Sequence, residues 1–524
     1  MKPSHSNIVR IASNYIRLAT TLVIGLLVVR LLLRFGDDAY ALVALLGTGT
    51  GMALMLKQVV RTSTVPILGE AFHSDRKGWF EQVFNSALLC SLLAGLLTLL
   101  FFVIFALCLP LLNFPDEFYT AALVFVIASG VHSFVNVSIS PFTNFYIVSE
   151  RMIAYNILLF LERFGDIVAV IATLLVLGVD DPSSAIITYG LTTASLYIVF
   201  NLGAAFLITR ADPRLVPNRS MVSREAISAF LKSVGWNGCV IFAINLYARV
   251  DMVIMNLFFG LFGNMVFGLA NQAVGYLRQL IFGLVSGMDA VAARMTKLDG
   301  NAAVLELMNR STKLQSLIVF PAMVVLLVFG ETLIELWLSG RLKDPEKTIP
   351  AIFWLMRILL FGVAARCLSE GWMSVMNGAG KVREYAIAVL VGGLLNPVLS
   401  VIAIKVFPET VQFAAVAIVF TTLMTIVHLV AIPWTVARSF RSSMLSIVSP
   451  IFKPAAIAIV CWVVSYYASI GFAEPVFSMI VFASVFGLTF VSGSYSWALD
   501  ETDRSTVHRL LSRFFPFSNS TPTS

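Results

Sequence analysis

The feature that most constrains this chain is a series of apolar runs, each about 20 residues long, separated by short polar loops. A run of about 20 residues, rising about 1.5 Å per residue as a helix, crosses the hydrocarbon core of a bilayer. With 58% apolar and only 12% charged residues, the 524-residue chain lies outside the range of soluble domains. The runs are too long and too uniform for the alternating strands of a membrane barrel. We therefore expect an all-α integral membrane protein.

The polar loops set the expected topology. We count fourteen transmembrane helices, and an even number returns both termini to the same side. Most Lys and Arg lie in the loops and tails on the side of the N-terminus, so the positive-inside rule predicts that both termini are cytoplasmic.

Internal repetition divides the expected bundle. DIVAVIATLL from Asp166 resembles PVLSVIAIKV from Pro397, and GDDAYALVA from Gly36 resembles GNMVFGLAN from Gly263, with both pairs about 230 residues apart. We expect two tandem six-helix lobes plus two appended helices. The expected parts are an N-terminal lobe of spans 1–6 (1–210), a cytoplasmic linker (211–228), a C-terminal lobe of spans 7–12 (229–435), the appended spans 13 and 14 (451–497) and a cytoplasmic tail (498–524).

The eighth span, near 265–290, carries a single arginine about halfway along it. Asn271, Gly275, Arg278, Phe282 and Ser286 recur at steps of three and four and so share one helix face. Arg278 lies roughly 20 Å from Met265, near the middle of a bilayer, where an arginine costs on the order of 2.5 to 3.5 kcal/mol. Such residues usually face a water-filled cavity or a partner. We expect Arg278 to line a cavity between the lobes.

Spans 1, 2 and 7 have similar polar stripes that include cations. The stripe residues are Asn14 and Arg17 in span 1, Lys57 and Arg61 in span 2, and Arg249 in span 7. Arg17, Lys57 and Arg61 can also be interfacial anchors, because long basic side chains reach toward the membrane surface. For Arg249 the alternative is an acid on a neighbouring helix. Two further groups can neutralise themselves within one helix: Arg366 with Glu370, and the cluster of Glu162, Arg163 and Asp166.

No constellation of a soluble enzyme appears. The sequence lacks a phosphate-binding loop, a zinc-protease motif, a nucleophile elbow and a dinucleotide fingerprint. The five histidines are scattered, and none has a second ligand at metal spacing. We expect no enzymatic activity, no cofactor and no metal, so any transport would draw on ion gradients, the membrane potential or the substrate's own gradient.

The chain resembles the MOP exporter superfamily in three features. These are the fourteen spans, the segment LLRFGDDAYALVALLGTGTGMAL and the segment NGAGKVREYAIAVL. The polysaccharide-exporter branch, the Wzx-type O-antigen and exopolysaccharide flippases, is most similar, and the lipid II flippase is a cousin. The resemblance covers essentially the whole chain and implies a MATE-like fold in the bacterial cytoplasmic (inner) membrane. It implies a flippase that moves an undecaprenyl-pyrophosphate-linked oligosaccharide for polysaccharide or lipopolysaccharide biosynthesis. By position, the substrate-binding cations would be Arg17, Lys57, Arg61, Arg249 and Arg278, with Asn14 and Asn271 beside them.

Two other classes remain open. MATE-type multidrug antiporters bind organic cations with membrane-embedded acids, commonly an aspartate in the first span, whereas span 1 here has no carboxylate before Asp37. A non-transporting membrane scaffold predicts that every buried cation is paired within its own helix. The expected partners are the lipid-linked oligosaccharide and membrane lipids, with a proton or sodium counter-ion and the polysaccharide polymerase machinery as further candidates; no nucleic acid is expected.

Overall fold

The structure is a computed structural model that describes residues 5–177, 181–285, 287–298, 300–470, 475–501 and 503–505. Within these ranges the chain is almost entirely helical and contains no strand, so the all-α prediction is confirmed.

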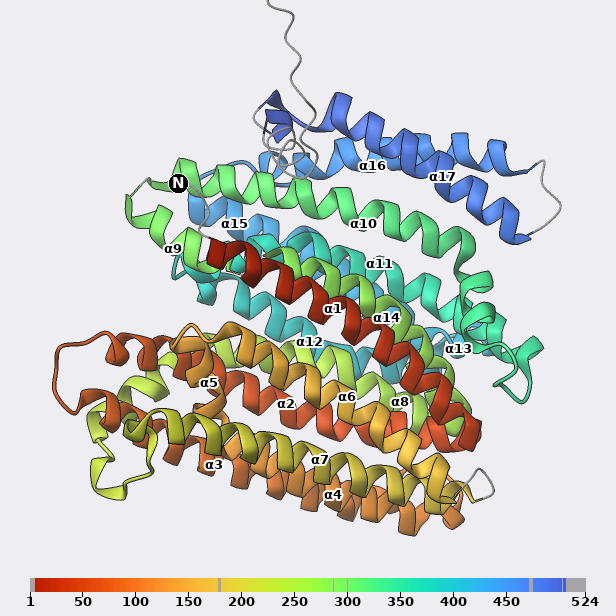
Figure 1. The fold of residues 1–524 in the computed structure, drawn as a ribbon. Coiled ribbons are helices and arrows are strands. Elements are labelled where there is room, and N and C mark those ends of the chain that lie inside the picture. The colour runs from red at the N-terminus through yellow and green to blue at the C-terminus, as the bar shows by residue number, and fades with distance from the viewer. Residues whose placement is uncertain are drawn as a thin grey trace, which may run out of the picture. The chain divides into compact units, whose positions relative to one another are not determined.

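The helices follow the chain in order (Figure 1). The first eight are α1 (His5–Leu32), α2 (Asp37–Phe72), α3 (Trp79–Cys108), α4 (Tyr119–Ser138), α5 (Ser140–Val148), α6 (Met152–Leu177), α7 (Pro182–Ala211) and α8 (Arg224–Val285). The others are α9 (Met288–Leu298), α10 (Gly300–Leu338), α11 (Pro345–Gly378), α12 (Val382–Val406), α13 (Glu409–Gln412), α14 (Ala415–Ile426), α15 (Ile432–Phe440), α16 (Met444–Ser469) and α17 (Pro475–Gly493). π-helical turns follow α14 (Val427–Ala431) and α17 (Ser494–Ala498).

The chain forms two compact units. Unit 1 comprises 1–283, 333–363 and 381–427, and unit 2 comprises 284–332, 364–380 and 428–524. The division into two six-helix lobes stays a prediction.

In unit 1, α4 packs between α3 and α7, α7 also contacts α6, and α6 contacts α1 (Figure 1). An aromatic core fills the space between α2, α3 and α5, where Phe84 and Phe145 are fully buried and Phe84 meets Phe142 edge to face. This packing fixes the rotation of α2 about its axis. The side of α2 that bears Lys57 and Arg61 is therefore set relative to α6.

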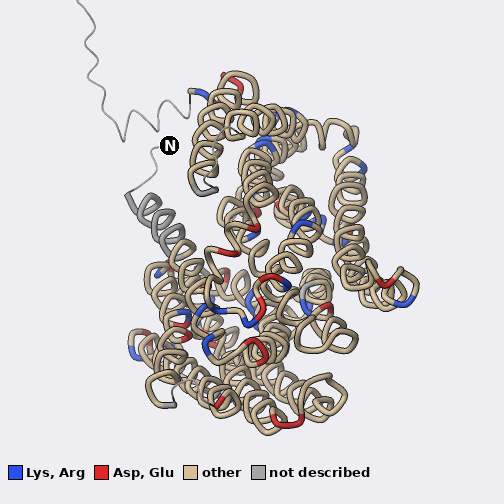
Figure 2. Tube along the Cα trace, turned by 90° about the vertical axis from the view of Figure 1, so that its right-hand side faces the viewer, with Lys and Arg blue, Asp and Glu red and all other residues tan. Residues whose placement is uncertain are grey.

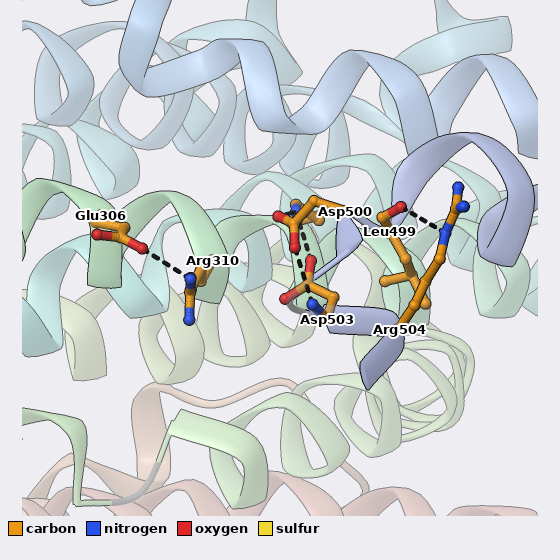
Figure 3. Close-up of polar contacts among 7 residues, drawn as sticks. Glu306, Arg310, Leu499, Asp500, Asp503 and Arg504 are labelled. Carbon is orange, nitrogen blue, oxygen red and sulfur yellow. Dashed lines mark hydrogen bonds and ion pairs between the residues drawn. The ribbon is translucent and has the colours of Figure 1, made fainter. Parts of the chain in front are cut away.

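In unit 2, α16 packs on a row of three stacked rings on α17, Phe482, Phe486 and Phe490. The centroids of Phe482 and Phe486 are 5.8 Å apart, and those of Phe486 and Phe490 are 5.6 Å apart. The chain after α17 is tied back to α10. Lys313 of α10 lies 2.9 Å from a carboxylate oxygen of Asp500 and 2.6 Å from one of Asp503 (Figure 3). The beginning of the predicted cytoplasmic tail is thus held by one lysine between two aspartates.

Within the part of the chain that the structure describes, twelve helices are long and apolar enough to cross a membrane. Their outward faces are apolar: on α3, Leu93, Leu97 and Leu100 are each more than half exposed. Figure 2 shows long stretches of helix without a charged residue. Surfaces of this kind are stable in lipid rather than in water, so the chain is a multi-pass membrane protein.

The twelve differ from the predicted fourteen at two places. Helix α6 is missing from the twelve, and it contains three charged residues close together, Glu162, Arg163 and Asp166. The predicted spans 7 and 8 are the two arms of α8, which are separated by a kink at Gly260 (φ 62°, ψ −155°) and are counted once among the twelve. Glycine reaches this backbone conformation without the steric penalty of a Cβ.

Candidate functional site

Arg249 lies deep in unit 1, on α8, with its guanidinium directly against α2. A Cβ added at Gly51 would overlap the Cζ and Nε atoms of Arg249 and lie 2.8 Å from Nη1, so the arginine occupies the space that glycine leaves on α2. Its Nε is buried without a hydrogen-bond partner. Among the described residues, no acid forms an ion pair with Arg249. A buried guanidinium in this state has hydrogen-bonding capacity left for an anionic group.

Lys57 and Arg61 lie one turn apart on α2 and face α6. The Nζ of Lys57 is 3.9 Å from a carboxylate oxygen of Glu162, and the amide of Asn201 on α7 donates to the same carboxylate at 2.8 Å. Arg61 donates to the hydroxyl of Tyr155 at 3.3 Å. Lys57 is therefore partly neutralised, whereas Arg61 keeps its charge and has a neutral partner.

Arg163 on α6 is exposed and forms an ion pair with a neighbouring acid. It pairs with Asp166 at 3.4 Å, as predicted from their spacing, and Tyr197 donates to the other oxygen of that aspartate at 3.1 Å. The side chain of Arg163 is 53% exposed, so it remains accessible although it is paired. The charge of Arg163 also acts on Arg249, so two cations from α6 and α8 lie in one region.

The other predicted residues are less defined. Arg278 and Asn271 are partly buried on the second arm of α8. Asn14 and Arg17 lie in the first part of α1, where side chains are outside the described residues. Lys57, Arg61, Arg249, Asn271 and Arg278 all belong to unit 1, and the site they would form stays a prediction.

Sequence reasoning missed two contributions from α6. Glu162 was assigned to a cluster that neutralises itself, but it approaches Lys57 instead, and Arg163 was not assigned to the cavity. Asp251, the acid nearest Arg249 in sequence, does not pair with it: Asp251 is fully buried and accepts a 2.7 Å hydrogen bond from Asn396 of α12. The charged triplet on an otherwise apolar helix was visible in the sequence, but spacing within one helix could not show that Glu162 approaches Lys57 of another helix.

The end of unit 1 that contains the connections after α1, α3 and α10 is tied together. Asn256 accepts from the backbone N–H of Asn113 at 2.7 Å and donates to its carbonyl at 3.0 Å. The backbone N–H of Lys343 donates to Asp37 at 3.1 Å, and its ammonium is 3.6 Å from Asp38. These contacts hold the start of α2 against the segment before α11.

These observations define a class: a multi-pass helical membrane protein that encloses cations inside its bundle. No protein-family model matches the sequence, and no curated protein matches it. The structure is similar to that of an inward-facing multidrug resistance MATE family transporter of the MOP superfamily, with 14% identity, a TM-score of 0.68, and coverage of 80% of this chain and 95% of that chain.

It is also similar to the lipid II flippase MurJ in an inward closed conformation, with 13% identity, a TM-score of 0.68, and coverage of 95% of this chain and 99% of the flippase. A MOP superfamily transporter from Pyrococcus furiosus, described as having a binding pocket of reverse polarity, matches with 14% identity and a TM-score of 0.64 over 83% of this chain and 96% of that chain. The fold is therefore that of the MOP superfamily transporters and flippases.

Proposed function

We propose that this protein is a flippase that moves an undecaprenyl-pyrophosphate-linked oligosaccharide across the cytoplasmic membrane for surface polysaccharide synthesis. The observation that carries the proposal is Arg249, a deep guanidinium with an unpartnered Nε and no paired acid among the described residues. Such a group attracts a pyrophosphate and repels an organic cation. Proteins with the same fold are transporters and flippases rather than enzymes, which agrees with a role in transport.

Each cation has a proposed role. Arg61 and Lys57 collect the headgroup at the cytoplasmic mouth, Arg249 and Arg163 bind it inside the bundle, and Arg278 remains the predicted deep site on the second arm of α8. Asn14, Arg17 and Asn271 stay predicted members of the same surface. We count α6 and the two arms of α8 as separate crossings, which gives fourteen spans with both termini in the cytoplasm and a cavity between two six-helix lobes.

The energetics allow outward movement without nucleotide hydrolysis. A headgroup with two negative charges that leaves a negative-inside cell gains about 4.6 kcal/mol at 100 mV, from roughly 2.3 kcal/mol per charge. The buried acids offer a further source of coupling: Glu162 and Asp166 lie beside the cations and can hold a proton or sodium counter-ion. The same acids are the observation that favours the second candidate, a MATE-type antiporter.

The test uses a strain that lacks the protein. Arg249→Ala should abolish polysaccharide export while the protein still inserts, and Arg249→Lys should partly restore it, because the charge survives but the planar fork of donors does not. Arg310→Ala is the matched control, because Arg310 is exposed and already paired with Glu306 at 2.7 Å (Figure 3). Normal export by a well-expressed Arg249→Ala protein would remove the proposal.

Depletion of the protein separates the two candidates. A flippase predicts that a lipid-linked oligosaccharide accumulates on the cytoplasmic leaflet. An antiporter predicts unchanged lipid-linked sugars and increased sensitivity to cationic drugs.

A further inference from the structure

A second group of cations lies at the end of unit 1 that contains the connections after α1, α3 and α10, away from Lys57 and Arg61. It consists of Arg30 at the end of α1, Arg34 in the short 3-10 helix Leu33–Phe35 and Arg341 in the loop before α11. The charges of Arg34 and Arg30 act on Arg341. The end of α1 also lies against the segment just before Arg341, because Arg30 donates to the carbonyls of Leu336 and Trp337.

Acids do not account for this cluster. Among the described residues, none of the three arginines forms an ion pair, and the nearby Asp37 and Asp38 bind Lys343 instead. Arg30 donates to the carbonyls of Leu336 and Trp337, which leaves its charge uncompensated. The Nε of Arg341 is buried without a hydrogen-bond partner. Partial desolvation, together with Arg34 and Arg30, lowers the pKa of Arg341, so the three side chains repel one another.

The sequence shows that the cations at this end are confined to two of the connecting segments. The connections at this end of unit 1 include 33–36, 109–118, 257–264, 339–344 and 407–414, and of these five only the first and the fourth contain Arg or Lys. Loops on the outer side of a membrane usually carry few cations. Mutually repelling arginines persist in a fold when an anion binds between them.

We propose that Arg30, Arg34 and Arg341 form a second phosphate site at this end of the bundle. The site accepts a phosphate-type headgroup after that headgroup has left the proposed binding site at Arg249. The site needs an accessible face, and Arg34 supplies it because it is exposed, whereas Arg30 and Arg341 are partly buried behind it. The anion has one of two sources: the pyrophosphate of an exported lipid, or an anionic phospholipid of the surrounding bilayer.

The experiment replaces Arg249 so that pyrophosphate binding by the second site can be measured. Full-length protein with Arg249→Ala is placed in phosphatidylcholine nanodiscs, and inorganic pyrophosphate binding is measured by calorimetry. In parallel, retention of phosphatidylglycerol from mixed nanodiscs is measured by native mass spectrometry. The test variant adds Arg34→Gln and Arg341→Gln, and the control adds Lys347→Gln, which removes a cation that lies over the ring of Phe262 at the same end. Arg30 is left intact because it caps the carbonyls of α10.

The double variant should weaken the remaining pyrophosphate binding by about tenfold or more, since two charge-assisted contacts are lost, and the Lys347 control should not. If only phosphatidylglycerol retention falls, the anion comes from the bilayer. If the double variant changes neither quantity relative to the control, the site does not exist. Because neither probe depends on export, failure of this site and failure of the flippase proposal are separate results.

Discussion

Replacing Gly51 gives the sharpest test of the proposed binding site at Arg249, because the substitution moves Arg249 without altering any charge. Replacement by alanine puts a Cβ where the Cζ and Nε atoms of Arg249 now lie. To reach ordinary contact distance, the guanidinium must move by about 1 Å, and misplacement of this size at a binding group reduces the rate by up to about 100-fold.

The fold should tolerate this substitution. The displaced atoms are at the far end of a flexible side chain, and alanine is favoured over glycine inside a helix by about 1 kcal/mol. Gly47, four residues earlier on α2, provides the matched control, because a Cβ there meets nothing within 4 Å. The two variants therefore share helix, neighbourhood and propensity gain, and differ only in contact with the arginine.

The assay compares export in a strain lacking the protein with the thermal unfolding midpoint and pyrophosphate affinity of the purified protein. We expect Gly51→Ala to unfold at or slightly above the wild-type temperature while export and affinity fall by about tenfold to 100-fold. Gly47→Ala should match the wild type in all three. If the two variants export equally well and bind equally well, Arg249 does not act through its position against α2.

Three further results are expected. Lys57→Met should lower the free energy of unfolding by about 1 to 2 kcal/mol because it leaves the buried Glu162 without its cation, and adding Glu162→Gln should restore most of the loss, as chemical denaturation can measure. A cysteine at Arg214 should react with a membrane-impermeant reagent only after the inner membrane is opened; labelling of intact spheroplasts would reverse the proposed orientation. The ammonium of Lys313 lowers the pKa of Asp500 to about 2 from 3.8, so this contact stabilises the protein fully above about pH 4 and is lost as the pH falls toward 2. After allowance for screening of the half-exposed aspartate its contribution is about 1 kcal/mol, and an Asp500→Asn protein should show no such loss in a thermal scan across that range.

Interactions within one helix could be predicted from sequence spacing, and those between helices could not. Arg366 and Glu370 are four residues apart and pair at 3.1 Å, as predicted, because helical geometry alone brings them together. The approach of Lys57 to Glu162 depends on how α2 and α6 are rotated against each other. That rotation is set by packing such as the aromatic core around Phe84 and Phe145, which no local pattern reveals.

The same limit applies to the cations. Helical spacing predicts that α2 and α8 carry polar stripes, since a 3.6-residue period can be read directly from the chain. It gave no means of ranking Arg249 against Arg278, because the decisive feature of Arg249 is the absence of a side chain on Gly51 of another helix. The two spans predicted near 229–256 and 265–290 correspond to the two arms of α8 on either side of the kink at Gly260.

The paired hydrogen bonds between Asn256 and the backbone of Asn113 bear on where this protein can be modified. Insertion of residues into surface loops is tolerated where the backbone makes no specific hydrogen bonds. The short connection after α3 looks suited to an epitope or a binding domain used as a marker for electron microscopy, yet both polar backbone groups of Asn113 are bound by one buried amide, which Asn264 in turn contacts at 2.7 Å. Lengthening that connection would detach it from α8, so a marker should not be inserted there.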